Sequence, residues 1–159
     1  EPYRRQRQMC IRDSDGSWKL IFVGDGPCRK ECMDYVSQKG ISSYVEFVGV
    51  VKDVDRYLAQ SKIFAFVSTS EGFPNALGEA VLFPTASISY NCPAGPEDII
   101  RDDENGFLVP LGKVEEYATK LKMLMESEEL RTRFEMNAVS DRSKYSMENI
   151  GESFFNFMF

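Results

Sequence analysis

Two glutamates, Glu71 and Glu79, lie on either side of the short segment Gly-Phe-Pro-Asn-Ala-Leu-Gly. The apolar run 63–67 before them is typical of a buried strand, and the small residues after Asn75 predict a new helix. The first turn of a helix leaves backbone N–H groups unpaired, so this junction could bind an anion such as phosphate. Carboxylates beside such a site are suited to accept hydrogen bonds from hydroxyls. Together these features favour a ligand with both phosphate and polyol groups, such as a nucleotide sugar.

The sequence supports a binding role more strongly for Glu79 than for Glu71. A glutamate near a helix start is commonly solvated and gains a little from the helix dipole, which alone would account for Glu71. Glu79 is different, because small or apolar residues surround it throughout the predicted helix 75–83. A helix that is apolar all round is buried, and an unpaired charge inside it is costly. We therefore expect Glu79 to face a polar cleft.

Composition narrows the possible classes of protein. A chain of 159 residues can form one domain with a real core. Its net charge of −6 argues against a nucleic-acid partner, and the absence of histidine excludes imidazole-based catalysis and histidine metal ligands. The four cysteines, at 10, 28, 32 and 92, lack a second ligand pair, so they predict neither a zinc site nor a disulfide framework and fit a reducing cytoplasm. No apolar run approaches the roughly 20 residues that cross a bilayer.

Residues 1–16 differ from the rest of the chain. The segment starts without methionine, and up to Ser14 it is polar, basic and without periodicity. The run Arg4-Arg-Gln-Arg-Gln-Met-Cys-Ile-Arg-Asp13 resembles translated sequencing-adapter read-through at the ends of gene fragments; the alternative is a solvated basic tail. On either interpretation we expect a disordered or artefactual tail outside the fold, and a chain that is a fragment of a longer protein.

From Ser17 onward, short β-rich runs alternate with amphipathic stretches, and a purely helical part follows Pro110. This order predicts an α/β fold, a Rossmann-like doubly wound parallel sheet with right-handed crossovers and a helical C-terminal segment. Ligands of such sheets bind beyond the carboxyl ends of the strands. The predicted strands are 19–23, 45–48, 63–67, 87–90 and 107–109, and the predicted helices are 27–38, 53–59 with Asp53 as cap, 75–83, 96–101, one from 114, 128–144 and one from 147.

The segment Glu71-Gly-Phe-Pro-Asn-Ala-Leu-Gly-Glu79 resembles the E-x7-E signature of retaining GT-B glycosyltransferases, known as glycosyl transferases group 1 or family 4. The resemblance extends from about Trp18 to about Ile150 and includes further motifs in the order of that family. They are Leu20-Ile-Phe-Val-Gly-Asp-Gly-Pro27, Val45-Glu-Phe-Val-Gly49 with Tyr57-Leu-Ala-Gln-Ser61, Asn91-Cys-Pro-Ala-Gly-Pro-Glu-Asp-Ile-Ile100, and Glu104-Asn-Gly-Phe-Leu-Val-Pro110.

The resemblance implies that residues 17–146 form the nucleotide-sugar-binding C-terminal domain, in part, with about five strands and the first strand of the family missing. Residues 147–159 would form a closing helix that contacts a missing N-terminal domain. The implied reaction of the full-length parent moves a hexose or N-acetylhexosamine, with retention, from a nucleoside-diphosphate sugar to a glycan or lipid-linked acceptor. UDP is the expected nucleotide, and we expect the fragment alone to be inactive.

The resemblance also implies roles for individual residues. Glu79 would bind the ribose hydroxyls, and Glu71 would lie near the donor sugar as the candidate catalytic residue. The donor sugar would contact Gly72, Phe73 and Pro74; the diphosphate would accept hydrogen bonds from the backbone of Asn75, Ala76 and Leu77; and the nucleobase would lie against the loop 49–52, at Gly49 and Val50. Gly24 and Gly26 would form a turn that lines the cleft.

Two of these assignments have local alternatives. Gly49 could equally be an ordinary strand-end glycine. Gly24-Asp-Gly26 could suggest a dinucleotide fingerprint, but the third glycine is absent and Pro27 removes an N–H group that phosphate would need. We therefore interpret this segment as a turn.

Departures from the family pattern set further expectations. The family's basic pair, an arginine and a lysine upstream of the Gly-Asp-Gly-Pro strand, is absent, and Phe83-Pro-Thr-Ala86 replaces a Gly-x-Pro, so the signature helix could end early.

No metal or other cofactor is expected. The parent would be cytoplasmic, with peripheral contact at the inner face of the membrane. Two alternatives remain open: another GT-B enzyme, such as a sugar-nucleotide epimerase or a phosphorylase, and a non-catalytic nucleotide-binding α/β module.

Overall fold

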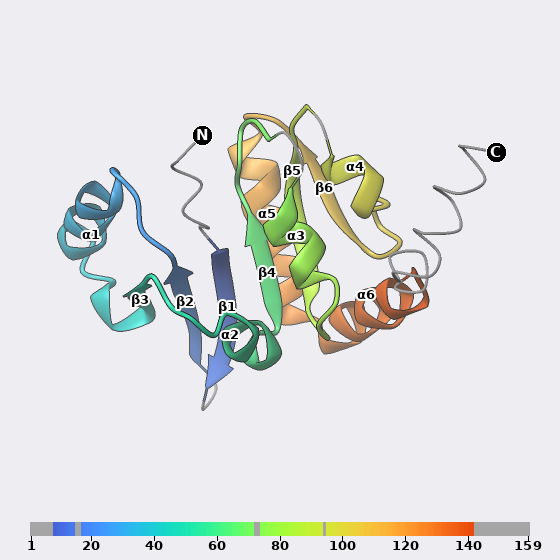
Figure 1. Cartoon of the computed structure of the whole chain (residues 1–159), viewed down its shortest axis with the longest axis horizontal. Helices are drawn as coiled ribbons and strands as arrows, with labels where there is room; N and C mark the ends of the chain where they lie inside the picture. The colour runs from blue at the N-terminus through green and yellow to red at the C-terminus, as the bar shows by residue number, and fades with distance from the viewer. Residues whose placement is uncertain (1–7, 15–16, 72–73, 94, 142–159) are drawn as a thin grey trace.

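The computed structural model describes residues 8–14, 17–71, 74–93 and 95–141 (Figure 1). The strands are β1 (Gln8–Ser14), β2 (Ser17–Val23), β3 (Val45–Gly49), β4 (Ile63–Phe66), β5 (Ala86–Asn91) and β6 (Gly106–Pro110). The helices are α1 (Arg29–Gln38), α2 (Asp55–Gln60), α3 (Asn75–Ala80), α4 (Pro96–Ile99), α5 (Val114–Glu126) and α6 (Glu128–Asp141), and a short 3-10 turn, η1 (Ser42–Tyr44), precedes β3.

The strands form one sheet in the order β3-β2-β1-β4-β5-β6. β2 pairs with β3 in parallel, and β4, β5 and β6 also pair in parallel. β1 is antiparallel to both β2 and β4, so the other five strands all point in the same direction. The strand order and the helical crossovers confirm the predicted Rossmann-like doubly wound α/β class. The five predicted parallel strands are β2 to β6, and β1 adds a sixth, antiparallel strand that was not predicted.

The centre of the sheet corrects one expectation. Gln8–Ser14 was expected to lie outside the fold as part of a tail, but it forms β1, which pairs with β2 along its whole length and with β4 from Met9 to Ile11. The physical reason is that backbone N–H and C=O groups at a strand edge need partners, whatever the side chains of the pairing segment are. Residues 1–7 and 15–16, which were also expected to belong to the tail, lie outside the described residues.

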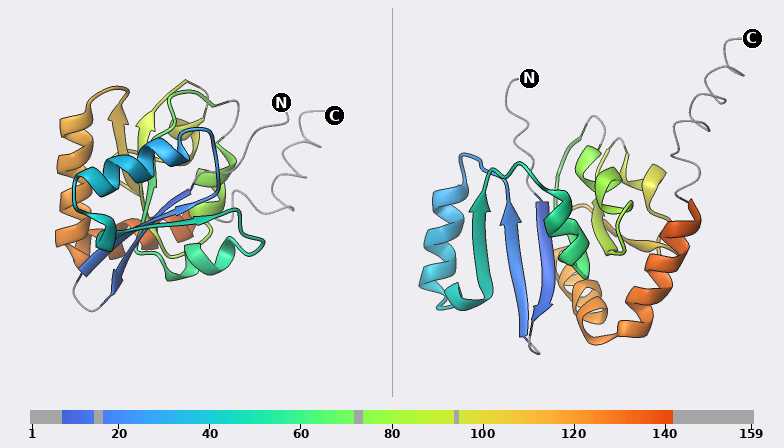
Figure 2. Two further views of the ribbon diagram at one scale, coloured as in Figure 1. Left: turned by 90° about the vertical axis from the view of Figure 1, so that its left-hand side faces the viewer. Right: turned by 60° about the horizontal axis from the view of Figure 1, so that its bottom comes forward.

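Helices cover both faces of the sheet (Figures 1 and 2). One core unites residues of β2 and β4 with α2, α3 and α4, and the other unites β4, β5 and β6 with α5 and α6. The first core contains Ile21, Val23, Leu58, Phe64, Phe66, Leu77, Ala80, Val81, Ile99 and Ile100; the second contains Ile63, Ala65, Ala86, Ile88, Phe107, Val109, Tyr117, Leu124 and Phe134. β4 therefore contributes to both layers, and all four of its residues are buried.

Helix boundaries differ from the predictions where the local turn geometry decides them. α1 begins at Arg29 rather than at Pro27, because residues 24–28 are used by the turn after β2. α3 ends at Ala80 rather than at 83, where the Thr85 hydroxyl donates a hydrogen bond of 2.8 Å to the Ala80 carbonyl. This early end agrees with the altered Phe83-Pro-Thr-Ala86 segment.

Asp53 accepts a hydrogen bond of 3.2 Å from the Arg56 N–H at the start of α2, as a capping side chain does. The predicted continuation of α6 to 144 and the closing helix 147–159 lie outside the described residues. Within the described part of the chain, no helix combines the length and the apolarity that a membrane span requires.

Candidate site at the carboxyl edge of the sheet

The carboxyl ends of β2, β3, β4 and β5 lie at the same edge of the sheet, because these strands are parallel to one another. Every described candidate residue from the sequence analysis lies in a turn or helix that starts from this edge. They are Gly24 and Gly26 after β2, Gly49 and Val50 at the end of β3, and Glu71, Pro74, Asn75, Ala76, Leu77 and Glu79 after β4. Gly72 and Phe73 lie outside the described residues.

A backbone hydrogen bond joins the turn after β2 to the turn after β3. The Gly24 N–H donates to the Gly49 carbonyl at 2.7 Å, and both glycines have positive φ angles, +117° at Gly24 and +73° at Gly49. Residues that have a Cβ atom rarely adopt positive φ angles, so the backbone conformation at both positions requires glycine. This accounts for Gly49 as a strand-end glycine, and its contact with a nucleobase stays a prediction.

The second glycine of the turn after β2 behaves differently from a phosphate-binding glycine. The Gly26 N–H donates to the carboxylate of Asp25 at 2.7 Å. A carboxylate that already accepts from this amide would repel a phosphate at the same place. The geometry supports the interpretation of Gly24-Asp-Gly26 as a turn rather than as a dinucleotide fingerprint.

The loops after β4 and β5 also lie against each other. Cys92, at the end of β5, is 2% exposed, and burial together with the nearby Glu71 carboxylate raises the pKa of its thiol. Pro74 is buried beneath Gly95, where an added Cβ would lie 2.3 Å from the Pro74 Cδ atom. The sequence analysis missed this contact, since no signal in the chain connects residues 74 and 95 before the strands are placed.

The signature helix α3 begins directly after Pro74. Leu77 and Ala80 pack into the core, whereas Glu71, in the loop after β4, and Glu79, on α3, are both half-buried. The Pro74 carbonyl accepts hydrogen bonds of 3.0 Å from the N–H groups of Leu77 and Gly78. The Leu77 amide is therefore engaged inside the helix, which leaves Asn75 and Ala76 as the amides on which a diphosphate contact depends.

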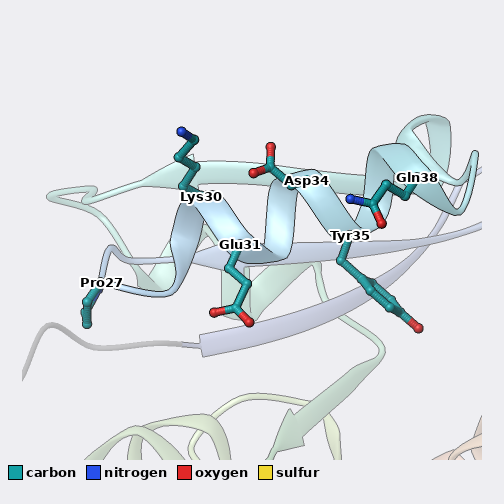
Figure 3. A pocket seen from close by; sticks show the side chains of 6 residues that line it. All are labelled: Pro27, Lys30, Glu31, Asp34, Tyr35 and Gln38. Atoms are coloured by element: carbon teal, nitrogen blue, oxygen red, sulfur yellow. The ribbon is translucent and has the colours of Figure 1, made fainter.

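An open hollow lies elsewhere, along the outer side of α1 (Figure 3). Its lining consists of Pro27, Lys30, Glu31, Asp34, Tyr35 and Gln38, all from α1 or the turn before it. One helix offers no opposing wall to enclose a ligand, and ligand sites are usually concave clefts between elements. We therefore place the candidate site at the carboxyl edge and not in this hollow.

No metal-binding group emerges from the part of the chain that the structure describes: no three His, Cys, Asp or Glu residues there are arranged to hold an ion. Glu71 lies near enough to Cys92 to affect its thiol, but one carboxylate and one thiol do not form a metal site. The expectation of a reaction without metal stays a prediction.

Fold and site together define an α/β domain of the doubly wound class with a polar edge between paired loops. Residues 7–141 match the model of the family described as glycosyl transferases group 1. The chain belongs to this family, and it corresponds to the C-terminal domain of a GT-B glycosyltransferase.

Individual relatives agree with this assignment. The chain is 32% identical, over 84% of its length, to the amylovoran biosynthesis glycosyltransferase AmsD of Erwinia amylovora, but covers only 37% of that protein. It is 32% identical to the C-terminal domain of the group 1 glycosyltransferase LpcC from Francisella tularensis, with a TM-score of 0.66, covering 75% of this chain and 63% of that one.

A longer superposition exists with a variant of S. aureus TarM, solved with fondaparinux, alpha-GlcNAc-glycerol and UDP. The TM-score is 0.77 at 26% identity, and the match covers 87% of this chain and 28% of TarM. The chain thus spans little more than a third of AmsD and less than a third of TarM.

Proposed function

We propose that this chain is the donor-binding half of a glycosyltransferase that transfers a hexose or N-acetylhexosamine, with retention, from a nucleoside-diphosphate sugar to a glycan or lipid-linked acceptor. The observation that carries the proposal is the position of Glu71 and Glu79. Both are half-buried acids, one in the loop after β4 and the other on the helix α3 that follows it, in a chain of the family glycosyl transferases group 1.

The proposed pocket lies between the two pairs of loops. The nucleobase would contact Gly49 and Val50, and Val50 is 71% exposed beyond the end of β3, where the flat face of a base could cover it. The ribose would hydrogen-bond to Glu79, and the diphosphate to the Asn75 and Ala76 amides. UDP is the proposed nucleotide, and the UDP complex of TarM supports this choice.

The donor sugar would lie over the loop after β4. Glu71 would orient the sugar or assist its transfer, and the segment Gly72, Phe73 and Pro74 would hold sugar hydroxyls. Since no acceptor site is proposed on these residues, the acceptor would be bound by a separate N-terminal domain of the parent. The parent would act in the cytoplasm, with peripheral contact at the inner face of the membrane.

The decisive experiment measures UDP binding by an NMR chemical-shift titration of the chain and of its Glu79→Ala variant. A carboxylate that accepts hydrogen bonds from two ribose hydroxyls contributes about 1.5–3 kcal/mol, so the substitution is expected to weaken binding roughly 10- to 100-fold. The matched control is Glu115→Ala, which removes an exposed acid from the first turn of α5 and is expected to leave the affinity unchanged.

Equal dissociation constants for the wild-type chain and Glu79→Ala would contradict the ribose assignment. In the full-length parent, the same variant is expected to lose most transfer activity. NMR of the glycoside product tests retention, because a product with the anomeric configuration opposite to that of the donor would exclude it.

A further inference from the structure

Arg29 is the first residue of α1 and reaches across to the end of β3. Its Nη2 atom donates a hydrogen bond of 3.2 Å to the Phe47 carbonyl. Its Nη1 atom lies 3.4 Å from the point where a Cβ atom on Gly49 would be, and the other guanidinium atoms, Cζ and Nη2, are 4.0 Å from it. The guanidinium group therefore packs directly against the Gly49 backbone.

The pairing of β2 with β3 is irregular at this place. Phe22 pairs with Phe47, but the next residue, Val23, pairs with Gly49, so Val48 is an extra residue in β3. An extra residue of this kind locally disrupts the ladder and bends the strand. Arg29 binds the carbonyl of Phe47, immediately before the irregularity, and contacts Gly49, immediately after it.

The bend is connected to the neighbouring turn. The Gly49 carbonyl accepts the Gly24 N–H at 2.7 Å, so the position of Gly49 also determines that of the turn after β2. Gly49 has a φ angle of +73° and, as a glycine, makes no side-chain contacts that could fix this backbone conformation. The rigid planar guanidinium of Arg29 supplies the packing that this backbone lacks.

Arg29 is held there at a cost. Its Nε atom is buried and has no hydrogen-bond partner among the described residues. A buried donor without an acceptor destabilises the folded state. An arginine is therefore a poor choice for this position if its only function is to stabilise the fold. The cost suggests that the geometry of the turn, rather than stability, is what the side chain provides.

We propose that Arg29 is a positioning residue for nucleotide binding: it sets the Gly49–Val50 turn that receives the base of a nucleoside diphosphate. The inference rests on the proposed function, since it assigns a support to the same site. Arg29 acts through the backbone of Gly49 and is not itself a ligand of the nucleotide.

The test compares Arg29→Met, Arg29→Lys and the control Lys30→Met, which removes an exposed cation from the next position of α1. UDP and inorganic pyrophosphate are titrated separately into each protein and followed by NMR. Arg29→Met is expected to weaken UDP binding about tenfold and pyrophosphate binding less than about twofold. Arg29→Lys is expected to be intermediate, because one ammonium can bond Phe47 but cannot pack flat against Gly49.

Equal losses for UDP and pyrophosphate in Arg29→Met would overturn the proposal, because they would mean that only the positive charge matters. A loss in Lys30→Met as large as in Arg29→Met would overturn it for the same reason.

A second readout needs no ligand. Hydrogen exchange of the Gly24 amide, which bonds to Gly49, is expected to become about tenfold faster in Arg29→Met while amides in β5 keep their rates. Unchanged exchange at Gly24 would overturn the positioning role. Absence of UDP binding by the wild-type chain would instead refute the proposed function, and the exchange comparison would still decide whether Arg29 sets the turn.

Discussion

Gly95 shows how a single residue without a side chain can determine the shape of the site. Its φ angle is +125°, and an added Cβ would lie 2.3 Å from Cδ and 2.9 Å from Cγ of Pro74. Pro74 is buried and precedes the first residue of α3. Any side chain at 95 would therefore displace the start of the helix that carries Glu79.

We predict that Gly95→Ala lowers the free energy of unfolding by about 3 kcal/mol, because backbone strain and a steric clash act together. Equilibrium urea unfolding measures this loss. Gly40→Ala is the matched control: Gly40 also has a positive φ angle, +68°, but an added Cβ there would meet nothing within 4 Å. Its expected loss is about 1 kcal/mol, from strain alone. Equal losses in the two variants would mean that the contact with Pro74 does not matter.

At the scale of elements, Tyr117 connects α5 to two strands. Its hydroxyl lies 3.2 Å from the Ile88 carbonyl of β5 and 3.4 Å from the Phe66 carbonyl of β4, and its ring packs on Tyr90 at 4.6 Å between centroids. Phe66 is the last residue before the loop that contains Glu71. The helix on one face of the sheet thus holds the strand end from which the site begins.

We predict that Tyr117→Phe lowers the free energy of unfolding by about 1 kcal/mol at pH 7, because the buried carbonyls lose a hydrogen-bond donor. The control is Tyr35→Phe on α1, where the ring is 58% exposed and the expected change is close to zero. Urea unfolding of both variants measures the difference.

The pH dependence of the same variant gives an independent check. Burial, and next the neighbouring Tyr90, raises the pKa of Tyr117 above its usual range. The folded state therefore keeps this proton while the unfolded state loses it, so wild-type stability falls as pH rises above about 10, the ordinary tyrosine pKa. Tyr117→Phe should lose less stability than the wild type over that window. Parallel pH curves for the two proteins would contradict burial of an un-ionised phenol.

For the whole molecule, β1 is the element that joins two halves. It lies between β2 and β4, and its neighbours on either side are the pair β3-β2 and the trio β4-β5-β6 (Figure 1). Removal of β1 would expose two unpaired strand edges in the middle of the sheet, which is an aggregation hazard as well as a loss of stability.

We predict that deletion of residues 1–14 abolishes cooperative thermal unfolding or lowers Tm by more than about 10 °C. Circular dichroism measures the transition and size-exclusion chromatography the aggregation. The control deletion removes residues 1–7 and leaves every described strand in place. A truncated chain that unfolds as cooperatively as the control would mean that β2 and β4 can pair directly without β1.

Particular residues show where prediction from the sequence succeeded. Residues 63–66 of the apolar run 63–67 form the fully buried strand β4, whereas Val67 lies beyond the strand and is exposed. Val114 marks the start of α5 as predicted. These predictions succeeded because periodicity and burial are recorded locally in the chain. Asp53 took its predicted place as a cap for the same reason. The predicted helix after Pro74 also formed, and Glu79 lies on it, whereas the roles of Glu71 and Glu79 stay predictions.

Other residues could not be assigned in this way. Leu77 was expected to offer its amide to a ligand, but the Pro74 carbonyl accepts it. Arg29 and Gly49 are twenty positions apart, as the residue numbers show, and neither has a sequence signal that refers to the other. Their contact exists only because β2 and β3 pair and bring α1 over the end of β3.

The amino-acid order alone determined the alternation of strands and helices and the parallel class of the five predicted strands, since each depends on spacing within short stretches. Its indication that a ligand binds at the carboxyl edge stays a prediction. Only the tertiary structure decided that Gln8–Ser14 is the central strand and that Gly95 lies against Pro74. The reason is that strand pairing and close backbone contacts satisfy hydrogen bonds and fill space between segments far apart in the chain, and no local pattern encodes which segment will do so.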